Sequence, residues 1–398
     1  MIETVKLGDV ATVKGGKRLP KGTNLITEPN SHPYIRVRDL NNQSTLELND
    51  DFEYVDDETQ KSISRYIVEA GDIVLSIVGT IGLVAIIGES LHKANLTENC
   101  VKLTQLDGVD RDYLYYFLKS GLGQAEIAKG TVGAVQAKLP IKNIQDIDVV
   151  LPDISTQQKI SSILRSIDNK IDNNQKINDN LEQQAQSYFQ ELFVDKANPE
   201  WTTGTISDLG AVVGGSTPSK AKPEYYTESG IAWITPKDLS INKSKFISHG
   251  ENDITELGLK NSSAAIMPEG TVLFSSRAPI GYIAIAAGEV TTNQGFKSVV
   301  PKPEIGTPFV YFFLKHNLPF IEGMASGSTF KEVSGSTMKN IPAVIPDVDT
   351  LDRFNDFCTS IFAQQRVLEE QSHSLAVLRD NLLPKLMSGE IDVSDIQL

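Results

Sequence analysis

The chain has 398 residues, enough for about two or three domains, and its 40% hydrophobic and 22% charged content is typical of a globular protein. It has no apolar run of the ~18 residues that a membrane helix needs and no signal-peptide pattern at Met1–Thr4, so a cytoplasmic protein is expected. The formal net charge of −14 argues against a chain that clamps DNA by itself, because neutralising phosphates requires Lys and Arg.

Charge is distributed unevenly along the chain. Residues 1–38 hold seven basic side chains against three acidic ones, which favours a basic face there. Residues 201–346 are balanced, with 12 of each sign, and residues 347–398 hold four basic and ten acidic side chains. The two cysteines, Cys100 and Cys358, lie in different kinds of segment, so no disulfide between them is expected.

The chain repeats its own sequence at an offset of 199 residues, which drifts to 194 by Asp153 and Asp347. Such a period is too long for a solenoid unit of ~20–50 residues and predicts two similar domains. The segments Thr4–Val10, Gly15–Gly16, Pro33–Leu40 and Gly71–Ser76 recur as Thr203–Leu209, Gly214–Gly215, Ala232–Leu239 and Gly270–Ser275.

Each copy opens with roughly 150 residues that read as mixed α/β. Asp72–Ile87 is apolar and interrupted by glycines, which predicts two strands joined by a turn, and Thr271–Ala287 is its counterpart. Tyr113–Lys119 and Phe309–Lys315 predict matched buried helices. The closing segments Ile147–Pro152 and Ala343–Pro346 predict strands that end at a proline.

Each copy then continues into a long heptad pattern, from about Ser155 to Val194 and from about Thr350 to Met387. The alternation of three- and four-residue spacing predicts two long helices in a coiled coil, with Asp153 or Ser155 as an N-cap of the first. The alternative is a helix that packs only on its own domain. The predicted seam consists of Ile160, Leu164, Ile167, Ile171, Leu181, Tyr188, Leu192, Phe354, Ile361, Leu368, Leu375, Leu382 and Leu386.

The seam also contains polar positions, Asn174, Asn178, Gln365, Ser372 and Arg379. In an antiparallel pair such residues help to fix register at some cost in stability. Helices of about 40 residues extend about 60 Å, so an antiparallel pair is expected to hold the two globular domains at opposite ends of a rod. The expected boundaries are 1–152 and 201–346 for the two globular domains, and 153–200 and 347–398 for the helices and tail.

Known catalytic patterns are missing from the sequence. There is no GxxxxGK[ST] phosphate loop, no amino-methyltransferase tetrapeptide, no GxSxG elbow and no metal-ligand spacing among the five histidines. Pro152-Asp153 followed by Asp168-Asn169-Lys170 echoes a metal-dependent nuclease motif. However, Asp168 and Lys170 fall inside the heptad helix, where residues two apart do not share a face. The chain therefore reads as a binding protein without a catalytic site or a bound metal of its own.

Several segments together resemble the specificity (S) subunits of type I restriction-modification systems. Leu151–Ala185 is similar to the central conserved helix of that family, and Leu378–Ile391 to the end of its distal conserved helix. The second copy resembles the opening of a target-recognition domain of that family at Gly214–Lys220 and Trp233–Leu239. The resemblance continues at Ser275–Gly281 and Asn293–Lys297. The first copy departs from this pattern: Gly15–Pro20 lacks the Gly-Gly-Ser-Thr-Pro form, and Val78-Gly79-Thr80 stands where Arg277-Ala278-Pro279 stands later.

The resemblance implies an α/β (α+β) fold with two mixed α/β target-recognition domains, each followed by a long helix, and an antiparallel intramolecular coiled coil. It implies a non-catalytic subunit whose domains each read one half of a bipartite, asymmetric DNA target. The helices are expected to set the spacing and to dock two methyltransferase (M) subunits, with restriction (R) subunits joining through the complex. S-adenosylmethionine, ATP and Mg²⁺ would belong to these partners.

Candidate DNA contacts follow from side-chain chemistry, since Arg and Lys suit guanine, and Asn and Gln suit adenine. The basic side chains of the Lys14–Lys21 loop are expected to contact phosphates. The base-reading candidates are Ser276, Arg277, Asn293 and Gln294. For each, an ordinary solvated side chain is the alternative. The paired glycines permit either a phosphate contact or a tight backbone approach. The candidates are Lys14, Lys17, Arg18, Lys21, Arg36, Arg38, Lys138, Ser216, Lys220, Lys237, Ser276, Arg277, Asn293, Gln294 and Lys331.

Two other functions remain open from the sequence. A coiled-coil adaptor or decoy would bind the same partners without any DNA sequence preference. A self-contained nuclease would cleave DNA with a metal ion, which the missing motifs disfavour.

Overall fold

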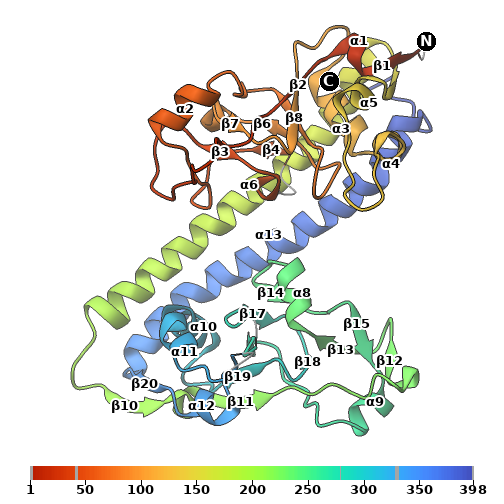
Figure 1. Ribbon diagram of the computed structural model, residues 1–398. Coiled ribbons are helices and arrows are strands. Elements are labelled where there is room, and N and C mark those ends of the chain that lie inside the picture. The colour runs from red at the N-terminus through yellow and green to blue at the C-terminus, as the bar shows by residue number, and fades with distance from the viewer. Residues whose placement is uncertain (1–2, 41–43, 278, 328–330, 397–398) are drawn as a thin grey trace. The chain divides into compact units, whose positions relative to one another are not determined.

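The computed structural model describes residues 3–40, 44–277, 279–327 and 331–396. The chain divides into two compact units: unit 1 comprises residues 1–173 and 372–398, and unit 2 comprises residues 174–371. Each unit therefore contains one α/β part and one section of each long helix (Figure 1). None of the helices in the described residues combines the length and apolarity that a membrane crossing requires.

Unit 1 is built on a five-stranded sheet with the order β2-β8-β5-β6-β4. The predicted strand pair is confirmed: β5 and β6 are antiparallel, and the turn between them contains Gly79 and Gly82 with φ of +81° and +93°. Both strands are buried on both faces, as expected for continuous apolar runs. The strands are β2 (Thr12–Gly15), β4 (Thr45–Leu46), β5 (Ile73–Ser76), β6 (Val84–Ile87) and β8 (Cys100–Thr104).

Two small sheets and short helices complete the α/β part of unit 1. Strand β1 (Glu3–Lys6) pairs antiparallel with β9 (Asp148–Leu151), and β3 (Tyr34–Ile35) pairs parallel with β7 (Asn95–Leu96). The helical elements are α1 (Leu7–Val10), η1 (Val37–Asp39), α2 (Asp57–Ile63), η2 (Glu89–Leu91), α3 (Arg111–Lys119), α4 (Gly121–Gly130) and α5 (Ile141–Gln145).

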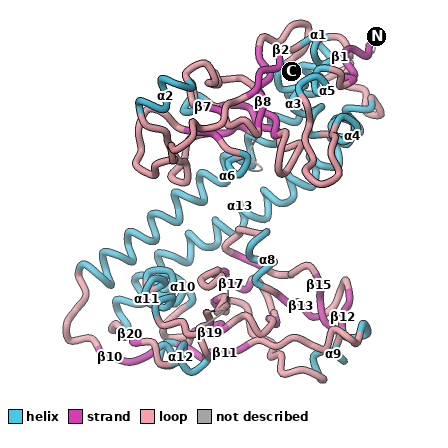
Figure 2. The backbone as a smooth tube through the Cα atoms, viewed as in Figure 1, coloured by secondary structure: helices cyan, strands magenta, loops and turns pink. Residues whose placement is uncertain are grey.

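Unit 2 repeats the strand order of the large sheet, which confirms the internal repeat. Both units combine strands with short helices, and the long helices α6 (Ile154–Gln190) and α13 (Val348–Ser388) run through them (Figure 2). The five-stranded sheet of unit 2 has the order β11-β19-β16-β17-β14, the counterpart of the sheet in unit 1. The strands are β11 (Gly210–Gly214), β14 (Phe246–Ile247), β16 (Val272–Phe274), β17 (Ile283–Ala286) and β19 (Lys297–Pro301).

The smaller sheets of unit 2 contain the pairings of unit 1, with β10 antiparallel to β20 and β13 parallel to β18. In unit 2, β15 and β12 extend the second of these sheets to four strands in the order β12-β15-β13-β18. These strands are β10 (Thr202–Thr205), β12 (Tyr226–Thr227), β13 (Ile231–Ile234), β15 (Asn252–Ile254), β18 (Thr291–Thr292) and β20 (Pro342–Ile345). The helices are α7 (Ile206–Leu209), η4 (Pro223–Tyr225), α8 (Pro236–Ile241), α9 (Glu256–Lys260), α10 (Thr307–His316), α11 (Leu318–Gly323) and α12 (Gly335–Lys339).

The matched helices α3 and α10 are buried, as predicted. Residues 113–118 of α3 and 308–314 of α10 are buried without interruption. A helix that is apolar on all sides requires neighbours on all sides. Here the five-stranded sheet and the long helices supply them, since the core of each unit includes residues of all three elements.

The two predicted long helices are confirmed as α6 (Ile154–Gln190) and α13 (Val348–Ser388). Asp153 caps the first, because the amide of Thr156 donates to its Oδ1 at 3.1 Å, and Asp347 accepts from Thr350 in the same way at 2.9 Å. Helix α6 ends in one π-helical segment, η3 (Glu191–Asp195).

The antiparallel pairing of the two helices is confirmed within each unit. In unit 2, Asn174 Nδ2 donates to Gln371 Oε1 at 2.9 Å, and Gln365 Nε2 donates to the carbonyl of Asn178 at 3.1 Å. Residue numbers rise along α6 while those of the contacted residues in α13 fall, so the two helices run antiparallel. In unit 1, Arg379 of α13 pairs with Asp168 of α6 at 2.8 Å, and the earlier Ile160 of α6 lines one hollow with the later Leu386 of α13.

The helix seam contains buried apolar, half-buried apolar and buried polar positions. Ile160, Leu164, Ile167, Leu192, Phe354, Ile361 and Leu386 are buried, whereas Ile171, Leu181, Tyr188, Leu368, Leu375 and Leu382 are only half-buried. The polar residues Asn174, Asn178 and Gln365 are buried. The buried polar positions favour one register, because a shift would leave their amides without partners.

Candidate nucleic-acid interface

The second glycine of each Gly-Gly pair packs against the backbone of a distant turn. A Cβ on Gly16 would lie 2.0 Å from the carbonyl oxygen of Thr97, and one on Gly215 would lie 1.9 Å from that of Asn293. Neither glycine has a positive φ among the residues described. Close backbone approach therefore explains these glycines, and it places the β2–β3 and β11–β12 loops beside the β7–β8 and β18–β19 turns.

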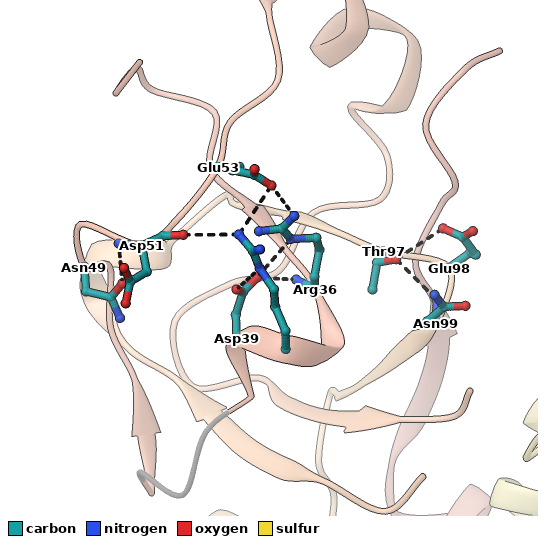
Figure 3. Close-up of polar contacts among 9 residues, drawn as sticks. Arg36, Asp39, Asn49, Asp51, Glu53, Thr97, Glu98 and Asn99 are labelled. Carbon is teal, nitrogen blue, oxygen red and sulfur yellow. Dashed lines mark hydrogen bonds and ion pairs between the residues drawn. The ribbon is translucent and has the colours of Figure 1, made fainter. Parts of the chain in front are cut away.

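Arginines and carboxylates gather beside this loop in unit 1 (Figure 3). The backbone amide of Arg36, which lies between β3 and η1, donates to Asp39 Oδ2 at 2.7 Å. The guanidinium of Arg36 forms an ion pair with Glu53. Arg38 reaches the same acids, with Nη2 3.4 Å from Glu53 and Nε 3.5 Å from Asp39. Two arginines thus share two carboxylates.

The β2–β3 loop adds a third arginine, Arg18, and the β7–β8 turn adds a further carboxylate, Glu98. Arg18 Nε donates to Glu98 Oε1 at 2.6 Å, although the Arg18 side chain is 80% exposed. A hollow of about 350 Å³ lies between these groups and is lined by Arg18, Arg36, Arg38, Glu98 and Asn99, among others. We call Arg18, Arg36, Arg38, Asp39, Asp51, Glu53 and Glu98 the arginine–carboxylate cluster.

Burial governs the ionisation of Asp39 in this cluster. Its side chain is only 6% exposed, and desolvation raises its pKa to about 6 despite the neighbouring charge of Arg38. Glu53 and Asp51 add to the rise because like charges disfavour ionisation. The arginines therefore offset a crowded set of acids.

The corresponding residues of unit 2 occupy the same places with different chemistry. Thr235 precedes α8 as Arg36 precedes η1, and its amide donates to Asp238 Oδ2 at 2.7 Å. Lys237 stands where Arg38 stands and pairs with Glu251 at 2.6 Å, with both side chains about 60% exposed (62% and 59%). The predicted correspondence of Arg38 and Lys237 therefore holds in three dimensions.

The turn contact is also replaced in unit 2. Thr217 Oγ1 donates a hydrogen bond to Gln294 Oε1, where unit 1 has the Arg18–Glu98 ion pair. Asn293 Oδ1 accepts from the amide of Gly295 at 2.8 Å, which shapes the turn. Gln294 is exposed and Asn293 half-buried.

Arg277 lies at the surface near this turn, but its neighbour Ser276 does not. Arg277 Nε is 3.0 Å from Glu332, which also approaches Lys297 Nζ at 3.6 Å. Ser276 is fully buried and its hydroxyl donates to the carbonyl of Gly295 at 3.1 Å. The Ser276 hydroxyl is therefore sequestered in the turn, and a base contact by Ser276 stays a prediction.

The candidates Lys138 and Lys331 do not occupy equivalent places in the two copies of the repeat. Lys138 bridges Val78 and Val132, and the residue that makes the equivalent bridges to Arg277 and Ser326 is Glu332. The counterpart of Lys138 is thus an acid. Of the motif around Lys331, residues 328–330 lie outside the described residues, as does Ala278 of the Arg277–Pro279 segment.

The remaining candidates are mostly exposed loop side chains. The Nζ of Lys17 lies 5.5 Å from the Tyr66 ring centroid, and the hydroxyl of Tyr34 donates to the Lys17 carbonyl at 2.8 Å. Ser216 is half-buried, and its carbonyl accepts from Trp233 Nε1 at 3.0 Å. The exposed candidates are Lys14, Lys17, Lys21, Lys138, Lys220 and Lys331.

The acidic partners were missed at the sequence level. Glu53, Glu98, Glu251 and Glu332 all contact candidate basic residues. The acidic run Glu47–Glu58 is visible in the sequence, but its pairing with arginines 15 or more residues earlier is not. Within the described ranges, no group of three or more His, Cys, Asp or Glu side chains is arranged to hold a metal ion.

Comparisons with known proteins agree on one family. The family model described as the type I restriction modification DNA specificity domain matches twice, at residues 2–183 and 198–369. The MjaIX specificity subunit of Methanocaldococcus jannaschii is 39% identical over 191 residues, which cover 46% of this chain and 44% of that protein. The HindI specificity subunit of Haemophilus influenzae is 24% identical over 329 residues, which cover 64% and 71% respectively.

A solved structure shows the same fold. The S subunit of a type I restriction-modification system from M. genitalium matches with a TM-score of 0.57 and 18% sequence identity, and the alignment covers 97% of this chain and 96% of that one. By sequence, in contrast, the chain spans less than half the length of the first relative named above.

Proposed function

The chain belongs to the family of type I restriction modification DNA specificity domains, and we propose that it acts as a non-catalytic DNA-specificity subunit whose two α/β parts each read one half of a bipartite target. The observation that carries this proposal is the pair of corresponding surface sites. They stand on the same elements of the repeat, yet unit 1 presents Arg18 and Arg38 where unit 2 presents Thr217 and Lys237.

Equivalent positions with different hydrogen-bonding groups are suited to reading two different sequences. Direct readout depends on which donors and acceptors face the base edges. A guanidinium, an ammonium and an amide select different edges, so the two half-sites should differ and the whole target should be asymmetric.

The long helices support the second part of the proposal. Helices of 37 and 41 residues act as spacers between the two readers, so that both half-sites lie on one side of the duplex, about one helical turn or 34–36 Å apart. They also supply the docking surface for two methyltransferase subunits. The methyltransferase subunits, and the restriction subunits that join the complex, bind S-adenosylmethionine, ATP and Mg²⁺.

The net charge fits a shared interface with DNA. A chain with a formal net charge of −14 is poorly suited to neutralise phosphates alone, so the partner subunits are expected to supply much of the phosphate contact. Binding by the isolated chain should accordingly be weak and binding by the methyltransferase complex strong.

Methylome sequencing after co-expression with the methyltransferase of the host tests the proposal. We expect methylated adenines in one asymmetric motif with two specified halves and an unspecified spacer. The double variant Lys237→Ala and Gln294→Ala should alter one half of that motif and leave the other unchanged. Methylation without any motif would instead support a coiled-coil adaptor that lacks sequence preference.

A further inference from the structure

The arginine–carboxylate cluster of unit 1 is unusual for a DNA-contacting surface because it carries no positive excess. The cluster combines three arginines with four carboxylates, Asp39, Asp51, Glu53 and Glu98, for a formal charge of −1. A surface that binds phosphates needs a positive balance, since its affinity comes from replacing condensed counterions. This cluster would repel a phosphate about as much as it attracts one.

A neutral partner with hydrogen-bond acceptors suits the cluster better. The guanine edge in the major groove offers two adjacent acceptors, O6 and N7, to a planar guanidinium fork. It carries no net charge, so the surrounding carboxylates do not repel it as they would a phosphate. The same carboxylates make it costly for the arginines to slide onto the backbone.

Arg38 is the arginine whose geometry fits that task. Its side chain is 57% exposed, whereas that of Arg36 is 22% exposed. Its contacts to Asp39, Glu53 and the Asp51 carbonyl are 3.4–3.5 Å long, longer than good hydrogen bonds. They orient the guanidinium without consuming its five N–H donors.

Arg36 and the two acids form the support beneath Arg38. Arg36 binds Glu53 through its guanidinium and Asp39 through its backbone amide, so both acids are held in place from behind. Such preorganisation reduces the side-chain entropy that a flexible arginine loses on binding.

We propose that Arg38 reads a guanine in the half-site bound by unit 1, with Arg36, Asp39 and Glu53 as positioning residues. This inference rests on the proposed function and assigns a base to one of its two readers. The equivalent of Arg38 in unit 2 is Lys237, a single ammonium without a planar fork, so the assignment applies to unit 1 only.

Selection of bound duplexes from a randomised library by the methyltransferase complex tests the inference. The wild-type complex should enrich a guanine at one position of one half-site. Arg38→Ala should reduce the preference for that guanine by roughly 5- to 150-fold and leave the other half-site unchanged. Lys129→Ala, which removes an exposed cation from α4, is the control and should change neither half.

The salt dependence of binding separates base reading from phosphate contact. For Arg38→Ala, the slope of log K against log [KCl] should stay within about half a unit of wild type, whereas loss of a phosphate contact lowers it by about one. Glu53→Gln should make the slope steeper and reduce the guanine preference, because it removes both a negative charge and a support for Arg38.

A wild-type complex that enriches no motif would overturn the proposed function and the inference with it. A wild-type motif that Arg38→Ala leaves intact, or a uniform loss of affinity with a smaller slope, would overturn the inference alone.

Discussion

In the two units, different buried charged residues connect similar α/β parts to the same pair of long helices. In unit 1, Asp168 of α6 accepts from Arg379 of α13 at 2.8 Å and from the hydroxyl of Tyr116 in α3 at 2.6 Å. In unit 2, Glu182 of α6 pairs with Lys315 of α10 at 2.6 Å and with Lys245, which precedes β14. In unit 1 the cation belongs to the long helix α13, whereas in unit 2 both cations belong to the α/β part.

This difference shows which part of the repeat is constrained. The order of strands, the buried helices α3 and α10 and the antiparallel helix pair recur, whereas the polar groups that join them do not. Apolar packing tolerates any residue of suitable size, but a buried charge requires a specific partner. The polar contacts therefore give each unit its own match between domain and helices.

Lys245→Ala is expected to have the largest effect on stability. Lys245 is buried, contacts Glu182 and Gln365, and lies 4.1 Å from the Phe362 ring centroid. Removing one partner of a buried pair costs about 3–5 kcal/mol. Trp201 and Trp233, the only tryptophans of the chain, both lie in unit 2, so urea unfolding followed by their fluorescence measures this loss.

The double variant Lys245→Met and Glu182→Leu is the matched control. Replacing both charges by apolar side chains should restore most of the stability, because Lys315, the other partner of Glu182, is 36% exposed and can be solvated. A loss below about 1 kcal/mol in Lys245→Ala would contradict a structural role for this pair.

Arg379→Ala should have the next largest effect, in unit 1. It leaves the buried Asp168 with the hydroxyl of Tyr116, and a cost of about 2–3 kcal/mol is expected. Hydrogen exchange of the α3 amides should accelerate while the tryptophan fluorescence of unit 2 stays unchanged. Asp380→Ala removes the exposed partner of the same arginine and should have almost no effect; equal losses in both variants would argue against the buried contact.

Gly16→Ala and Gly215→Ala test whether the loops of the two units are equally constrained. In each case the new Cβ would overlap a backbone carbonyl, so the loop must move, at a cost of about 1–3 kcal/mol. Each variant should disturb only the half-site of its own unit in methylome sequencing. Gly214→Ala is the control, since its Cβ would meet only Lys297 Cδ at 3.9 Å.

The sequence was sufficient for the architecture because apolar pattern and repetition are local or periodic signals. Asp72–Ile87, Tyr113–Lys119 and the heptad seam predicted strands, buried helices and the helix pair before any contact was known. Their burial follows from the side chains themselves.

The polar sites required the structure because charge partners lie far apart in the chain. Arg18 and Glu98 are 80 residues apart, and Lys245 and Gln365 are 120 apart. Nothing in the local sequence marks Lys245 as buried or Ser276 as sequestered, since both residue types are usually exposed. Side-chain chemistry was enough to choose candidate DNA contacts, but it could not show that acidic side chains neutralise several of them.

Exchanging charge between the two turns should give the smallest and most selective effect. Glu98→Gln removes a negative charge from unit 1, and Gln294→Glu adds one at the corresponding exposed position of unit 2. Because Arg18 is 80% exposed, stability should change by less than about 1 kcal/mol. If both turns face the DNA, the slope of log K against log [KCl] should steepen with Glu98→Gln and flatten with Gln294→Glu. A change in only one variant would show that only that unit places its turn against the backbone.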